Sequence, residues 1–146
     1  MTITQTKTWD YDAVEVGQEA QPTITVVTPE SVFRHATVVR SVNAAYHLTD
    51  VESDLGAAPL AMPTQIFSLA PKNRGGIAEN NGMNVVTAHA TPFAKCEGRW
   101  FAPIRVGDTV TSVARVLEKY ERRGNKFVTV RLEPHNQLGE KLAEIN

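Results

Sequence analysis

The sequence is poor in cysteine, in long apolar runs and in net charge, and each absence excludes a class of protein. Its single cysteine, Cys96, excludes an internal disulfide bond and suits a reducing cytoplasm. No apolar run approaches the roughly 18 residues of a membrane-spanning helix, and the first twenty residues lack the apolar segment of a signal peptide. Fifteen basic and sixteen acidic residues give a net charge of −1, which provides no broad attraction to nucleic acid or acidic membranes. We therefore expect a cytoplasmic globular protein.

Isolated titratable residues give little sign of chemistry. We interpret His35 as a helix surface residue, His89 as a structural strand residue and His135 as a loop or cap residue. No histidines or acids have metal-ligand spacing on a predicted helix, so we expect no metal or other cofactor. Asp50 lies in an acidic, solvated run, with a substitute base as the alternative, and Asp108 is expected to close a turn.

The first half of the chain predicts two helices. Thr28-Pro29-Glu30 is a typical helix start, with a capping threonine, a proline at the first helical position and an acid in the first turn. The most apolar helical stretch is TQIFSLA, residues 64–70, between Pro63 and Pro71. In the first helix, the apolar spacing predicts a buried face made of Val32, Phe33, Ala36 and Val39.

The second half predicts antiparallel strands joined by turns at Gly124 and Gly139. Residues 1–20 are expected to form a loose lead-in, and the Gly/Asn-rich residues 73–82 a mobile loop. The whole chain, 1–146, then makes one α+β domain in which about five strands wrap around the helix at 64–70. The expected strands are 24–27, 85–90, 97–101, 109–120, 126–135 and a last one from 141.

Three segments carry a resemblance to a known family: WFAPIRVGDTV, KYERRGNKFVTV and NQLGEKLAE. With the order of elements, they resemble the MaoC-like hydratase/dehydratase family, which has the hot-dog fold, and its branch related to the dehydratase domain of fatty-acid synthases. The resemblance covers about residues 10–145. It implies a single hot-dog domain whose last strand, ending at Asn146, is trimmed relative to the family.

In active family members an Asp and a His act on the water added to, or removed from, an enoyl thioester. The register that matches Asn43, Gly56 and Pro63 to the family puts Ser41 at the Asp position and Tyr46 at the His position. Serine has no base of its own, and tyrosine, with a pKa near 10, is protonated at neutral pH. This register therefore implies that the catalytic pair is lost.

A rival register, moved by one residue, puts His47 at the histidine position but leaves Val42 in place of the Asp. It also loses the Gly56 and Pro63 matches. In either register the chain has at most half of the pair.

This pattern resembles the non-catalytic subunits of heterodimeric (3R)-hydroxyacyl dehydratases. It implies a second hot-dog subunit that carries Asp and His, and an acyl-CoA or acyl-carrier-protein thioester as substrate. It also implies that the backbone N–H at the start of the central helix, where Thr64 replaces the family's glycine, faces the thioester oxygen. The expected substrate-binding residues of this chain are Asn43, Pro63, Thr64, Gln65 and Phe67.

Two alternatives stay open. One is a self-sufficient homodimeric hydratase or thioesterase that uses His47 or Asp50 from an altered site. The other is a hot-dog module that binds acyl-CoA and catalyses nothing.

Overall fold

The C-terminal half of the chain forms an antiparallel sheet, with a tight hairpin at the predicted glycine turn. The computed structural model describes residues 7–47, 59–72, 74–85 and 92–146. Arg123 and Gly124 have φ angles of 51° and 77°, the left-handed conformation of a two-residue hairpin turn. The sheet contains four strands in the spatial order β4–β8–β7–β6. Their bounds are β4 (Gly98–Trp100), β6 (Ala114–Arg122), β7 (Asn125–Leu132) and β8 (Ala143–Ile145).

A second antiparallel pair extends this sheet. Strand β2 (Thr23–Val26) pairs with β5 (Thr109–Ser112). The single strand predicted over 109–120 is thus two strands, β5 and β6, interrupted at Val113. Thr111 and His135 exchange two backbone hydrogen bonds of 2.9 Å, which join β5 to the segment following β7. The result, among the described residues, is one curved antiparallel surface of six strands, close to the predicted number.

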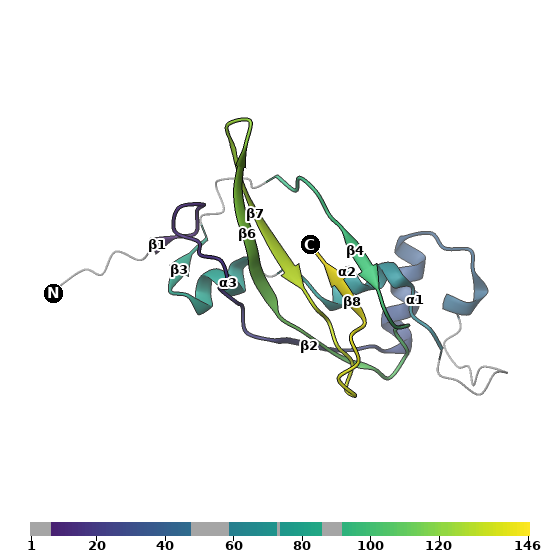
Figure 1. Ribbon diagram of the computed structural model, residues 1–146. Helices are drawn as coiled ribbons and strands as arrows, with labels where there is room; N and C mark the ends of the chain where they lie inside the picture. Colours follow the sequence, from purple (N-terminus) through teal and green to yellow (C-terminus); the bar gives the residue numbers. More distant parts are fainter. Residues whose placement is uncertain (1–6, 48–58, 73, 86–91) are drawn as a thin grey trace.

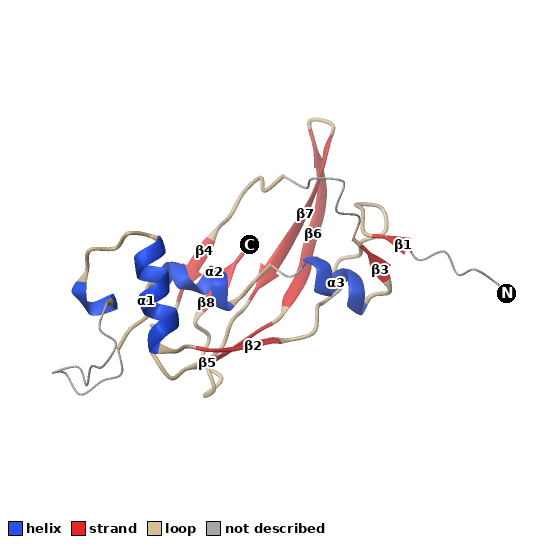
Figure 2. Cartoon of the chain, turned by 180° about the vertical axis from the view of Figure 1, so that it is seen from behind, coloured by secondary structure: helices blue, strands red, loops and turns tan. Residues whose placement is uncertain are grey.

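Helices α1, α2 and α3 lie on one face of the sheet, behind it in Figure 1 and in front of it in Figure 2. The central segment 63–69 comprises a 3₁₀ turn and the short α2, in which Ile66 is fully buried and Leu69 nearly so. Both pack in one core with sheet residues such as Val110 and Leu132. The bounds are α1 (Pro29–Val38), η1 (Ala44–Tyr46), η2 (Pro63–Gln65), α2 (Ile66–Leu69) and α3 (Arg74–Asn80).

Helix α1 begins where the sequence predicted. The Thr28 hydroxyl accepts from the Ser31 N–H, and the Ser31 hydroxyl accepts from the Thr28 N–H, both at 3.1 Å, a reciprocal cap that satisfies two otherwise free donors. The buried face is narrower than predicted. Val32 and Ala36 are buried, as expected, but Phe33 and Val39 are 40% and 46% exposed.

The segment 73–82, predicted as a loop, contains helix α3. Its Ile77 is fully buried and Ala78 nearly so, and burial of this apolar side overrides the low helix propensity of the neighbouring glycines. The helix is followed by the short strand β3 (Met83–Asn84), which pairs in parallel with β1 (Lys7–Thr8). Most of the strand predicted at 85–90 lies outside the described residues.

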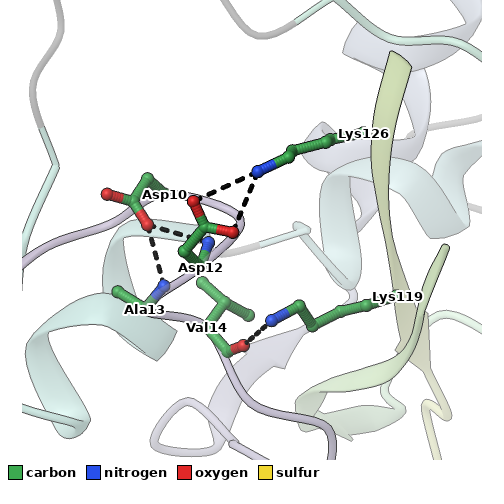
Figure 3. Close-up of polar contacts among 6 residues, drawn as sticks. All are labelled: Asp10, Asp12, Ala13, Val14, Lys119 and Lys126. Atoms are coloured by element: carbon green, nitrogen blue, oxygen red, sulfur yellow. Dashed lines mark hydrogen bonds and ion pairs between the residues drawn. The ribbon is translucent and has the colours of Figure 1, made fainter. Parts of the chain in front are cut away.

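Residues 7–20 are not the loose lead-in that the sequence suggested. Figure 3 shows how they attach to the β6–β7 hairpin: Lys126 lies 2.9 Å from an Asp12 carboxylate oxygen, and Lys119 donates to the Val14 carbonyl. The Asp10 carboxylate closes the turn between them by accepting two backbone N–H groups. Val14 itself is fully buried. Residues 7–20 are therefore held by polar contacts with the hairpin and by the burial of Val14. The composition of the segment did not indicate either.

Charged side chains connect the last strand to its neighbours. Lys141 contacts Glu133 and lies 3.0 Å from Glu144, while Arg131 lies 3.3 Å from Glu144. The hydrogen bond from Lys141 lowers the pKa of Glu144, and the charge of Arg131 acts in the same direction. The hydrogen bonds that Lys141 donates, to Glu133 first and to Glu144 second, raise the pKa of Lys141.

In the described parts of the chain, no helix is long and apolar enough to cross a bilayer.

Glu144→Gln should make the stability of the protein less sensitive to acid. A carboxyl group whose pKa lies below its ordinary 4.5 in the folded state stabilises the fold above that value and loses this contribution as pH falls through the lowered pKa. Urea denaturation at a series of pH values measures the effect. Glu79→Gln, exposed on α3, is the control. An unchanged acid dependence in the Glu144 variant would contradict the assigned role.

Ile66→Ala should destabilise the fold by about 2–5 kcal/mol, because it leaves a cavity between α2 and the sheet. The neighbouring Phe67 is 46% exposed, so Phe67→Ala should cost clearly less. The measurement is the free energy of unfolding in urea. Equal losses for the two variants would show that the central helix is not the centre of the core.

Candidate functional site

The central segment is tied to α1 by a buried amide. Gln65 is 2% exposed, and its Nε2 donates to the Ser31 hydroxyl at 3.1 Å. Its Oε1 is buried without a hydrogen-bond partner. The structure thus places this predicted substrate-binding residue inside the protein, between the cap of α1 and the start of α2.

A second contact joins the same two elements one helical turn further along α1. The His35 Nε2 lies 3.1 Å from the Thr64 hydroxyl, and His35 is half-buried. His35 thus lies at the helix surface, as interpreted, but it also contacts the central segment, which the sequence did not indicate. Ser31 and His35 are four positions apart and share one face of α1, which meets the adjacent Thr64 and Gln65.

The segment after α1 carries the two positions at which the family resemblance expects an Asp and a His. Arg40 has a φ of 55°, which turns the chain sharply out of the helix, and both Ser41 and Tyr46 are half-buried. The Asn43 side chain accepts from the Ala45 N–H at 3.0 Å and so caps η1. Asn43 is exposed, and its side-chain oxygen is used within its own turn.

His47, the candidate of the rival register, is held by the same segment. Its Nε2 donates to the Ser41 carbonyl at 2.6 Å, and its ring meets the Phe33 ring edge-on at 5.6 Å between centroids. Within the described ranges no ion pair joins His35 or His47 to a carboxylate. Among the described residues, therefore, no carboxylate pairs with His47, and Asp50 and His89 lie outside those residues.

An almost wholly apolar groove of about 320 Å³ runs beside these residues. Three elements line it: Tyr46 belongs to η1, Pro63 begins the central segment and Trp100 ends β4. The indole N–H of Trp100 donates to the Pro63 carbonyl at 3.0 Å, which fixes the groove wall to the central segment. The lining residues are Tyr46, Leu60, Ala61, Pro63, Trp100, Phe101, Ala102, Pro103 and Ile104.

Of the predicted binding residues, Pro63 lines the groove, Thr64 is exposed next to it and Phe67 is exposed on α2. The His35–Thr64 contact and the part of the groove between Trp100 and Ile104 were not identified from the sequence. The sequence analysis treated the run from Trp100 as a structural motif only, so it did not predict that these residues line the groove. Asp108 closes a turn as predicted, since its carboxylate accepts the Arg105 N–H at 2.8 Å. The described residues include no group of three potential metal ligands.

Comparison with known proteins agrees with this architecture. The family model described as the FAS1-like dehydratase domain region matches residues 14–145. No curated protein sequence matches the chain.

Several solved structures share the fold. A monoamine oxidase regulatory protein from Archaeoglobus is 22% identical with a TM-score of 0.74, and the match covers 95% of this chain and 91% of that one. The HadBC (3R)-hydroxyacyl-ACP dehydratase complex of Mycobacterium tuberculosis is 21% identical with a TM-score of 0.72, covering 90% and 94%. The R-hydratase PhaJ1 of Pseudomonas aeruginosa is 18% identical with a TM-score of 0.66, covering 92% and 80%.

The antiparallel sheet curved around a central helix, the family match along nearly the whole chain and these shared folds lead to one conclusion. The chain is a hot-dog protein and belongs to the FAS1-like dehydratase region family.

Proposed function

We propose that this chain is the acyl-binding subunit of a hydratase/dehydratase that interconverts (R)-3-hydroxyacyl and trans-2-enoyl thioesters. The catalytic Asp and His come from a second hot-dog subunit. The proposal is supported by the residues Ser41 and Tyr46, which stand where the family resemblance expects the catalytic pair, and by the structural observation that the Nε2 of the adjacent His47 is bound to a backbone carbonyl.

Hydration of an enoyl thioester requires a base that takes a proton from water and an acid that delivers one to the carbon next to the carbonyl. Neither the Ser41 hydroxyl nor the protonated Tyr46 phenol can take the proton at neutral pH. His47 has no carboxylate partner among the described residues, and in the proposed role it supplies at most half of the pair. The chemistry is therefore assigned to another chain.

The groove supports the binding half of the proposal. Most of its lining residues are apolar and none is charged, which favours burial of a hydrocarbon chain over a charged group. The proposed substrate is an acyl-CoA or acyl-carrier-protein thioester in the cytoplasm.

The edge of the sheet supports a partner. Strand β4 is the outermost strand of its four-stranded sheet and is exposed along its length. An uncovered edge offers free backbone N–H and C=O groups for pairing with another strand. Phe67, Phe93 and Phe101 are also 46%, 62% and 57% exposed, and a partner could cover such apolar side chains. The similar HadBC and ChsH1–ChsH2 structures are described as complexes, which favours a second hot-dog subunit as the partner.

The test is hydration of crotonyl-CoA, followed as loss of enoyl absorbance. This chain alone should be inactive, as it lacks the acid–base pair, and activity should appear on mixing with a MaoC-like subunit from the same source that bears Asp and His. In the mixture, His47→Ala should leave the rate within about twofold of wild type, because His47 is no catalyst.

The matched control replaces the catalytic histidine of the partner with alanine and should abolish activity. Activity of this chain alone, lost in His47→Ala, would contradict the proposal and favour a self-sufficient enzyme. Binding of crotonyl-CoA without turnover, even in the mixture, would instead favour a non-catalytic binding module.

A further inference from the structure

The wall of the apolar groove contains a tryptophan whose ring is fixed at both ends. At one end the Trp100 indole N–H donates to the Pro63 carbonyl at 3.0 Å. At the other end the six-membered part of the ring lies over Gly98, two residues earlier in β4. A Cβ atom on Gly98 would come 2.9 Å from Cη2 and 3.0 Å from Cζ3 of the indole, closer than carbon atoms pack. The glycine therefore leaves the space in which the ring rests.

Rings make up most of the groove around Trp100. Five of the nine lining residues that the structure describes carry a ring: Tyr46, Pro63, Trp100, Phe101 and Pro103. Trp100 and Phe101 are 43% and 57% exposed, so both rings have area that a ligand can cover. Aromatic side chains have only two side-chain torsions, and contact with them therefore costs little conformational entropy. The groove thus offers a flat, rigid wall to its ligand.

We infer that Trp100 determines the specificity of this groove, which favours acyl groups with an aromatic ring conjugated to the thioester, and that Gly98 is a positioning residue for the indole. The inference rests on the proposed acyl-binding function and names the class of acyl group. Aromatic rings attract one another beyond the area that they bury, so a fixed indole distinguishes an aromatic ring from a saturated ring of the same size. A conjugated aryl group is also rigid before it binds, and it loses less freedom than an alkyl chain does.

Two ligands that differ only in the saturation of one ring test the role of Trp100. Cinnamoyl-CoA carries a phenyl ring, and 3-cyclohexylpropenoyl-CoA carries a cyclohexyl ring on the same enoyl thioester. The wild-type chain should bind cinnamoyl-CoA about two- to tenfold more tightly in isothermal titration calorimetry, the effect of one aromatic contact. Trp100→Leu, which keeps the wall apolar, should bind the two ligands with equal affinity.

Gly98→Ala tests the same wall with the tryptophan in place. The added methyl group should displace the indole and lower the preference for cinnamoyl-CoA. Because Trp9 and Trp100 are the two tryptophans of the chain, the emission of a Trp9→Phe variant reports on Trp100, and Gly98→Ala in that background should shift it. Gly75→Ala in α3 is the matched control, since a Cβ atom there meets no other atom within 4 Å. It should change neither the emission nor the preference.

Equal wild-type affinity for the two ligands, or a preference that persists in Trp100→Leu, would overturn the inference, while binding of both thioesters would leave the acyl-binding role intact. If Trp100→Leu does not fold, an unchanged preference and emission in Gly98→Ala would overturn the inference instead. Failure of the wild-type chain to bind either ligand would overturn the acyl-binding role and this inference together.

Discussion

Burial of the central segment inside the curve of the sheet is the constraint on which the other features depend. Ile66 and Leu69 enter the common core, and the residues just before them form hydrogen bonds to neighbouring elements. Pro63 is tied to Trp100 of the edge strand, and Thr64 and Gln65 are tied to α1. One buried helical turn thereby positions the groove wall, the contacts with α1 and the edge strand together. A change in its packing would disturb all three.

The sequence predicted the regular parts of the fold because each had a local cause. The Thr28 cap and the positive-φ turn at Gly124 act within a few residues and could be identified from residue types. Helix α3 could not, because its stability comes from burying Ile77 against distant strands. The attachment of residues 7–20 to the β6–β7 hairpin depends likewise on partners more than a hundred positions away.

The site shows the same division. The placement of Ser41 and Tyr46 at the two catalytic positions stays a prediction from the family resemblance, since it concerns residue identity alone. The contact of His35 with Thr64 joins residues 29 positions apart, and no periodicity in the sequence marks it. The apolar groove likewise forms from three separate segments.

Restoring the missing pair tests this account most directly. The double variant Ser41→Asp with Tyr46→His places a carboxylate and an imidazole at the two catalytic positions, beside the groove that Tyr46 lines. Crotonyl-CoA hydration by the purified chain, without any partner, is the measurement. The account predicts no activity for the wild type and measurable activity for the double variant, with neither single change sufficient. A wild-type chain that already hydrates crotonyl-CoA, or a folded double variant that remains inactive while retaining thioester binding, would contradict it.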